Sequence, residues 1–121
     1  MPKNERKTLI KKLDIVISKY VIQRDGFCVQ CGSPERLTCG HLFSRRLMSV
    51  RFDLDNCHCQ CWPDNFRHGQ WPEYYTAWFL KEYGQEKYLE LEVKAHTLRK
   101  WSIPELKSEL ERIQGLISEL Q

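Results

Sequence analysis

Long hydrophobic runs are missing from this chain, and their absence excludes a helical membrane protein. No stretch approaches the roughly 18 consecutive apolar residues that a membrane-spanning helix requires. Residues 1–7 are rich in charge and carry no apolar core, so we expect no secretory signal. Internal repeats and low-complexity segments are also missing, which excludes repeat arrays. The 121 residues are expected to form a single domain, residues 1–121.

Cysteine, in contrast, is plentiful. All six cysteines lie between Cys28 and Cys61. In a chain that is not exported, cysteines are metal ligands or free thiols before they are disulfides. Cys28 and Cys31 have the spacing of a zinc knuckle, and Cys61 begins a second half-site. A structural zinc would help so small a domain, because the metal contributes about 10–16 kcal/mol in zinc-finger peptides.

The fourth zinc ligand has two candidates. Asp64 follows Cys61 at the expected spacing, and carboxylate oxygen binds zinc, although four cysteines are more common. Cys59 is the alternative, because Cys57, Cys59 and Cys61 lie on one side of a strand. We interpret Cys57 and Cys39 as small buried apolar residues.

Apolar periodicity predicts a helix before the cysteine-rich segment and a hairpin inside it. Apolar residues repeat at spacings of three and four over residues 8–24. Two short strands are expected near residues 37–42 and 56–60, joined by a loop rich in arginine. The core, residues 25–70, would hold the zinc.

The C-terminal region, residues 72–121, is predicted to be helical. Pro72 suits the first turn of a helix, Gly84 suits a helix end, and another helix is expected over about 85–95. Residues 102–105 (Ser-Ile-Pro-Glu) form a capping box before the last helix. The narrow apolar seam of that helix fits packing on the N-terminal helix, our default, or pairing with a second subunit.

Charge and polar residues point to phosphodiester chemistry. Lys and Arg outnumber Asp and Glu in residues 1–51, which suits a phosphate-rich partner. His41 lies in this basic half, and histidine is a base at neutral pH. Asn56 lies on the returning strand and Asn65 begins the next helix, where its amide oxygen would face His41. Such oxygens suit a hydrated Mg²⁺ ion.

A family resemblance is carried by several runs of residues between positions 12 and 61. They are Lys-Leu-Asp at residues 12–14, Ser-Lys-Tyr at 18–20, Arg-Asp at 24–25, Cys-x-x-Cys-Gly at 28–32, Cys-Gly-His-x-x-Ser-Arg-Arg at 39–46 and Arg-Phe-Asp-x-x-Asn-x-His-x-Gln-Cys at 51–61. In these runs the chain resembles the phage NinG/Rap recombination proteins, which fall in the HNH (His-Me finger) nuclease group. Its layout is also similar to phage endonuclease VII. Weaker similarity continues as far as residue 106.

The resemblance implies an α+β fold, in which a ββα-metal (HNH) core with a zinc knuckle is flanked by an N-terminal helix and C-terminal helices. It implies a metal-dependent endonuclease that cuts branched recombination intermediates such as Holliday junctions. His41 would be the general base, Asn65 a ligand of a catalytic Mg²⁺ or Mn²⁺ ion, and Asn56 the brace of the histidine loop. His58 would bind metal or the scissile phosphate.

The implied partner is branched or duplex DNA, and no membrane partner is implied. The DNA phosphates would be contacted by four arginines, Arg45, Arg46, Arg51 and Arg67. Symmetric cutting of a junction would call for two active sites and hence a homodimer. A phage-encoded protein of this kind would act in the cytoplasm of a bacterial host.

Two positions near the histidine depart from the pattern. Thr38 stands where the family has an aspartate, and Gly40 stands where endonuclease VII has an acidic residue. The catalytic ion therefore lacks an obvious carboxylate, which Asp53 or Asp55 could supply. The alternative function is a zinc-stabilised module that binds branched DNA without cutting it.

We interpret His68 and His96 as surface residues. A zinc scaffold that docks on another protein through the C-terminal apolar seam is a third reading, and it predicts no salt-sensitive affinity for DNA.

Overall fold

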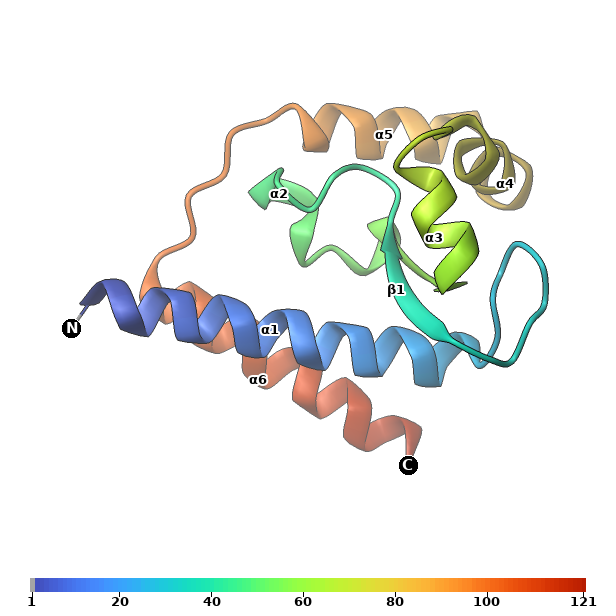
Figure 1. The fold of residues 1–121 in the computed structure, drawn as a ribbon. Coiled ribbons are helices and arrows are strands. Elements are labelled where there is room, and N and C mark those ends of the chain that lie inside the picture. Colours follow the sequence, from blue (N-terminus) through green and yellow to red (C-terminus); the bar gives the residue numbers. More distant parts are fainter. Residues whose placement is uncertain (1) are drawn as a thin grey trace.

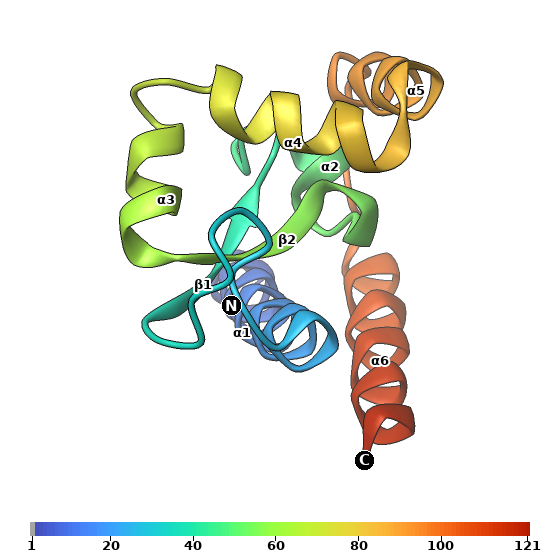
Figure 2. The same ribbon diagram turned by 90° about the vertical axis from the view of Figure 1, so that its right-hand side faces the viewer.

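A two-stranded antiparallel sheet lies between helices in the computed structural model, which describes residues 2–121 (Figures 1 and 2). Residue 1 lies outside the described part. The elements, in chain order, are α1 (Pro2–Asp25), β1 (Leu37–His41), α2 (Met48–Arg51), the 3₁₀ helix η1 (Leu54–Asn56), β2 (Cys57–Cys61), α3 (Trp62–His68), α4 (Glu73–Tyr83), α5 (Gln85–Ala95) and α6 (Ile103–Leu120). The expected small α+β fold is confirmed.

The register of the hairpin decides which way each side chain points. Leu37 pairs with Cys61 and His41 pairs with Cys57, so the predicted strands are confirmed to within one residue. Because side chains alternate along a strand, the odd-numbered residues of both strands share the face toward α1. The even-numbered residues point the opposite way, and among them His58 contacts the aromatic side chains of α4.

The first hydrophobic cluster joins α1, the sheet and α6. The buried stripe of α1 consists of Leu9, Leu13, Ile17 and Val21. These side chains pack with Cys57 and Cys59 of β2 and with Leu106, Ile113 and Ile117 of α6. The predicted N-terminal helix is confirmed, although it begins six residues before position 8. Packing of the C-terminal seam on α1 is confirmed as well, and the two helices run side by side (Figure 1).

The second cluster lies on the other side of the sheet. It is made by Leu42, Val50, Tyr75, Phe79, Leu91 and Ala95. The cluster packs α4 and α5 against the loop and short helix that follow β1, so it fixes the segment immediately after His41.

The end of α1 is tied to β2 by polar contacts. The Asp25 carboxylate accepts a hydrogen bond from the Cys59 backbone N–H at 2.8 Å. The Arg24 guanidinium donates to the Cys57 carbonyl at 2.7 Å. The Val29 N–H, just beyond the helix, donates to the Cys59 carbonyl at 2.9 Å. These bonds place the knuckle cysteines beside the end of the sheet.

The helix boundaries of the C-terminal half follow the sequence signals closely. Gly84 separates α4 from α5 with φ 89°, a left-handed value that favours glycine. Ser102 and Glu105 make both hydrogen bonds of the predicted capping box. Pro72 is the residue before α4 and not a member of its first turn.

No helix in residues 2–121 is long and apolar enough to cross a membrane.

Candidate functional site

Four potential zinc ligands converge at one corner of the molecule. Cys28 and Cys31 follow α1, Cys61 ends β2, and Asp64 lies in the first turn of α3. Their ligand atoms all lie within 4.8 Å of one another. A tight turn at Gly32, whose φ is 80°, lets the Gly32 N–H donate to the Cys28 carbonyl at 2.8 Å. The corner therefore joins three elements that are distant in sequence.

The spacing and chemistry of this corner fit zinc. The Cys31 and Cys61 sulfurs are 3.6 Å apart, and Cys28 Sγ lies 3.2 Å from Asp64 Oδ2. A tetrahedral zinc with Zn–S bonds of about 2.3 Å would place its sulfurs about 3.8 Å apart. All six cysteines are free of disulfide bonds. Burial raises the pKa of the Cys61 thiol to about 12, so its thiolate needs a neighbouring cation.

The two candidates for the fourth ligand occupy different places. Asp64 lies at the corner, whereas Cys59 is buried in the hydrophobic cluster against α1. Arg67, expected to contact phosphate, pairs with Asp64 at 3.1 Å and lies 4.4 Å from the centre of the Tyr74 ring. Its guanidinium therefore braces the Asp64 carboxylate.

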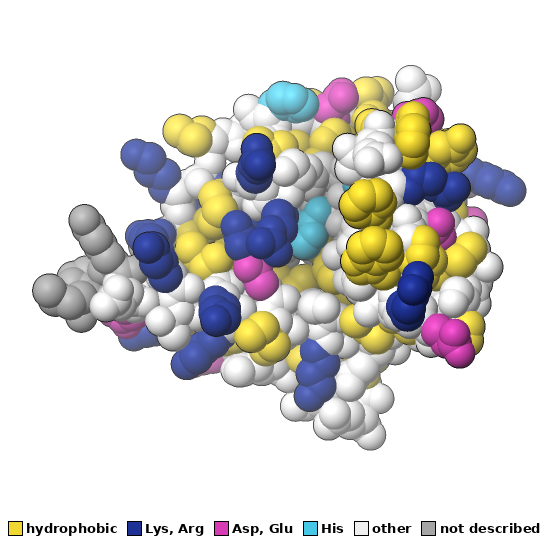
Figure 3. Space-filling model, in the orientation of Figure 1, with side chains coloured by type: hydrophobic (Ala, Val, Ile, Leu, Met, Phe, Trp, Pro, Cys, Tyr) yellow, Lys and Arg dark blue, Asp and Glu magenta, His cyan; other side chains and the backbone are white. Residues whose placement is uncertain are grey.

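A cavity of about 360 Å³ opens beside His41, between α1, β1 and α3. It is lined by Asp14, Ile17, Ser18, Cys39, His41, Ser44, Arg45, Asn65, His68 and Gly69. On this face of the molecule a histidine lies between basic and acidic side chains on one side and hydrophobic side chains over α3 on the other (Figure 3). The cavity therefore gathers a base, a carboxylate, an amide and a guanidinium.

His41 is held in one tautomer by the backbone. Its Nε2 lies 3.0 Å from the Arg51 carbonyl, which can only accept, so Nε2 carries the proton and Nδ1 keeps its lone pair. Burial lowers the pKa of His41 below its usual value, although the Arg51 hydrogen bond and the Asp14 charge oppose that effect. A neutral ring with a free lone pair is what a general base requires.

Asn56 holds the loop that follows His41. Its side chain is fully buried. Its Oδ1 accepts from the Phe43 N–H at 2.8 Å, and its Nδ2 donates to the carbonyls of Phe43 at 2.9 Å and Val50 at 3.2 Å. These three bonds span the chain from just after His41 to just before Arg51, whose carbonyl fixes the histidine.

Asn65 presents its amide to the same cavity from α3. Its Nδ2 donates to Thr38 Oγ1 at 3.0 Å and to the Cys39 carbonyl at 3.5 Å. The amide oxygen is thereby turned away from β1 and makes no hydrogen bond within residues 2–121. Thr38, which stands where the family has an aspartate, donates to the Gln60 carbonyl at 2.7 Å and so orients Asn65.

Asp14 supplies the cavity with a carboxylate that the sequence analysis did not assign. It forms a two-bond ion pair with Arg51, with Arg51 Nε at 3.0 Å from Oδ1 and Nη2 at 2.5 Å from Oδ2. Arg51 was expected to contact DNA phosphate, but its guanidinium is paired with Asp14 and only 18% exposed. One signal could have found Asp14: it is the single acidic residue among residues 8–24, beside the apolar stripe.

The family is shown by comparison with known proteins. Residues 3–121 match the family described as the bacteriophage Lambda NinG protein. The chain belongs to the NinG family. Membership makes it a phage protein related to recombination. No curated protein and no solved structure is matched.

In this NinG-family chain, His58 lies outside the cavity. It is 3% exposed, on the face of the sheet opposite His41. Its Nδ1 lies 2.9 Å from the Tyr75 hydroxyl, which in turn donates to the Gly40 carbonyl at 2.9 Å. Rings of Trp78 and Phe79 meet it edge-on. The expected contact with metal or phosphate does not fit this position, and we assign His58 a structural role.

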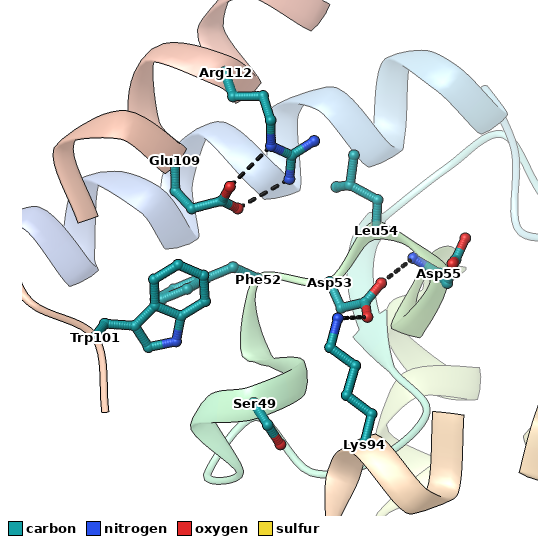
Figure 4. A pocket seen from close by; sticks show the side chains of 9 residues that line it. All are labelled: Ser49, Phe52, Asp53, Leu54, Asp55, Lys94, Trp101, Glu109 and Arg112. Carbon is teal, nitrogen blue, oxygen red and sulfur yellow. Dashed lines mark hydrogen bonds and ion pairs between the residues drawn. The ribbon is translucent and has the colours of Figure 1, made fainter. Parts of the chain in front are cut away.

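The acidic residues suggested from sequence also lie elsewhere. Asp53 and Asp55 line a separate pocket between α5, α6 and η1, not the His41 cavity (Figure 4). Asp53 pairs with Lys94 at 2.5 Å and Asp55 with Lys87 at 3.4 Å. A side chain at Gly40 would require Gln60 to move, because its first carbon would lie 1.7 Å from Gln60 Oε1. Asp14 is therefore the one carboxylate among the residues that line the His41 cavity.

Two other groups near His41 differ from expectation. His68, interpreted as a surface residue, lines the cavity. Its Nε2 lies 3.0 Å from the Leu42 carbonyl. Its Nδ1 is buried and has no hydrogen-bond partner within residues 2–121. Cys39 and Cys57, interpreted as apolar, bring their sulfurs within 4.8 Å of each other and of a His41 ring nitrogen. Cys57 is fully buried, as expected.

The four-ligand corner makes zinc content a direct measurement. We expect one zinc per chain by atomic emission, and loss of that zinc in Cys28→Ser. A site worth about 10 kcal/mol or more rivals the whole stability of a small domain, about 5–15 kcal/mol, so this variant should also lose its cooperative thermal transition.

Cys39→Ser is the matched control and should keep both the zinc and the transition. If Cys39→Ser loses the metal while Cys28→Ser retains it, the zinc lies at the Cys39, His41 and Cys57 group instead. Full zinc content in Asp64→Ala would show that the carboxylate is not needed to retain the zinc.

Burial of His58 predicts an abnormal titration. Burial lowers its pKa from 6.5 to about 4. Between these values the unfolded chain binds a proton at His58 that the folded chain does not bind. The free energy of unfolding therefore decreases as the pH falls through this range. In an NMR titration, its ring proton shift should stay constant from about pH 7.5 to about pH 5.5, with His58→Gln used to assign the signal. A midpoint near its ordinary value would show that the ring is solvated.

Proposed function

We propose that this protein is a metal-dependent endonuclease that cuts branched DNA recombination intermediates such as Holliday junctions. The observation that carries the proposal is the cavity that brings His41, Asn65 and Asp14 together beside an exposed arginine. The order β1, β2, α3, with a base on the first strand and an amide on the helix, fits a ββα-metal (HNH) core. Family membership supports a role in recombination.

His41 is the general base in this mechanism. Its Nε2 proton is committed to the Arg51 carbonyl, so Nδ1 takes the proton from an attacking water. The lowered pKa of His41 keeps the ring neutral and ready to accept that proton at neutral pH. Asn56 keeps the carbonyl in place through its bonds to the loop. Such proton transfer typically contributes a factor of about 10²–10⁴ to the rate.

The oxygen atoms beside His41 fit a hydrated divalent cation. The Asn65 amide oxygen and the Asp14 carboxylate would be its protein ligands. His68, on the same helix as Asn65, could add its Nδ1 lone pair as a further ligand. Mg²⁺ suits such a site, because it needs only one or two protein oxygens and keeps several waters. When bound, the cation stabilises the negative charge that develops on the phosphate.

Two arginines beside the cavity suit the DNA backbone. Arg45 lines the cavity, and both Arg45 and Arg46 are exposed. Neither side chain forms an ion pair within residues 2–121, unlike Arg51 and Arg67. Guanidinium groups bind phosphate in a forked geometry and would fix the scissile phosphate next to His41. Symmetric cutting of a junction would require two copies of this chain.

A binding module without cleavage is the second candidate. The observation that favours it is the Asp14–Arg51 pair, in which both carboxylate oxygens are already engaged. If that pair holds, the cation has no free carboxylate among the residues that line the cavity. Both candidates need zinc and DNA, and they differ only in whether the DNA is cut.

Removal of the base separates the two candidates. We expect wild-type protein with Mg²⁺ to cut a four-way junction, and His41→Ala to cut about 10²–10⁴ times more slowly while binding the junction equally well. Product strands are measured on denaturing gels and binding by gel shift. His96→Ala, a change at the exposed C-cap histidine that follows α5, is the control and should cut normally.

Junction binding without any cutting by the wild-type protein would support the binding module. Absence of junction binding would remove both candidates.

Asp14→Asn tests the carboxylate. The change keeps the size of the side chain and removes its charge, so both the Arg51 pair and the cation site weaken. We expect cutting to fall roughly 10- to 100-fold at low Mg²⁺, with recovery as Mg²⁺ is raised. Asp55→Asn, at an exposed residue of the remote pocket, is the control. Equal Mg²⁺ dependence for all three proteins would show that Asp14 does not serve the cation.

A further inference from the structure

We propose that Trp62 and Phe66 of α3 form a binding site for unpaired nucleobases at the edge of the His41 cavity. This inference rests on the proposed function and adds to it the feature of the DNA that the protein recognises. We call the pair the aromatic platform.

The platform is a stacked and exposed pair of rings. The Trp62 and Phe66 ring centroids are 5.2 Å apart and their planes differ by 18°. The side chains are 54% and 56% exposed. A spacing of four residues places them on one side of α3. Exposed aromatic side chains that lie together, and not singly, mark an interaction surface.

Arginines are positioned over the rings of this region. The Arg36 guanidinium carbon lies 5.8 Å from the Trp62 ring centre, and Arg67 lies over Tyr74, another half-exposed ring. Arg36 has φ 55°, a left-handed backbone that arginine rarely adopts. Its carbonyl accepts the Trp62 N–H at 2.8 Å, so this conformation fixes Arg36 beside the ring. Aromatic faces beside cationic side chains suit nucleic acid better than an apolar protein surface.

The same short helix serves both the platform and the cavity. Asn65 and His68 line the cavity, whereas Trp62 and Phe66 are exposed to solvent. Figure 3 shows hydrophobic side chains gathered over α3 next to a surface histidine. A base stacked on the platform would therefore bring the adjoining backbone phosphate toward His41 and Arg45.

The geometry favours unpaired bases over paired ones. In a continuous duplex both faces of every base are covered by its neighbours, so no face is available for a protein ring. At a branch point, a gap or a fork, unstacked bases expose their faces. Stacking on an aromatic side chain is largely independent of base identity. The platform would thus give preference for DNA structure without preference for sequence.

The test compares gapped and fully paired DNA of equal length. Zinc-loaded protein without added Mg²⁺ is mixed with a duplex that carries a three-nucleotide gap, and with the intact duplex. Fluorescence anisotropy gives both affinities. In the double variant Trp62→Ala, Phe66→Ala, the preference for gapped DNA should fall roughly tenfold or more, with duplex binding unchanged.

A stacking readout and two controls complete the test. 2-Aminopurine placed in the gap should lose fluorescence on binding the wild-type protein and keep it with the double variant. The single variant Trp62→Phe retains a ring at this position, so it should keep the wild-type preference for gapped DNA. Leu98→Ala removes an 85% exposed apolar side chain beyond α5 and should behave as wild type.

The outcomes separate the platform from the proposed function. Unchanged gap preference in the double variant overturns the platform and leaves the endonuclease proposal intact. A wild-type protein that binds neither DNA overturns both.

Discussion

The register of one short hairpin decides the organisation of this protein. Pairing of His41 with Cys57 places the odd-numbered residues of both strands toward α1 and His58 toward the aromatic cluster. A shift of one residue would turn the side chains of one strand to the opposite face, because side chains alternate with a period of two. Either His41 would then leave the cavity or His58 would leave the aromatic cluster. Asp25, bonded to the Cys59 N–H, and Asn56, bonded to Phe43, both fix the observed register.

His41 is supported chiefly by Asn56 and Arg51, neither of which is among the residues that line the cavity. Asn56 is buried and fixes the loop, the loop presents the Arg51 carbonyl, and that carbonyl sets the tautomer of the ring. Asp14 then pairs with the Arg51 side chain. Buried hydrogen-bonded networks of this kind are rigid, because any broken bond leaves an unpaired polar group. The proposed base is therefore preorganised by its support.

Ligand chemistry divides the candidate metal ligands into two places. Three sulfurs and one carboxylate gather at the end of β2, where a soft, tetrahedral ion fits. Oxygen donors gather beside His41, where a hard, hydrated ion fits. Helix α3 starts at the first place and borders the second, so a metal at the knuckle would hold Asn65 in position. The pocket between α5, α6 and η1 is different, because most of its charged groups pair with one another (Figure 4).

The sequence by itself determined the local structure: the helix over residues 8–24, the two strands, the capping box at Ser102 and the knuckle spacing of Cys28 and Cys31. These depend on near neighbours, through periodicity, capping and turn chemistry. Only the tertiary structure decided the partners across the chain. It paired Arg51 with Asp14, enclosed His58 among aromatic rings and placed His68 in the wall of the His41 cavity. Residues so far apart in sequence come into contact only when helices pack on both faces of the hairpin. Their spacing along the chain therefore does not predict these contacts.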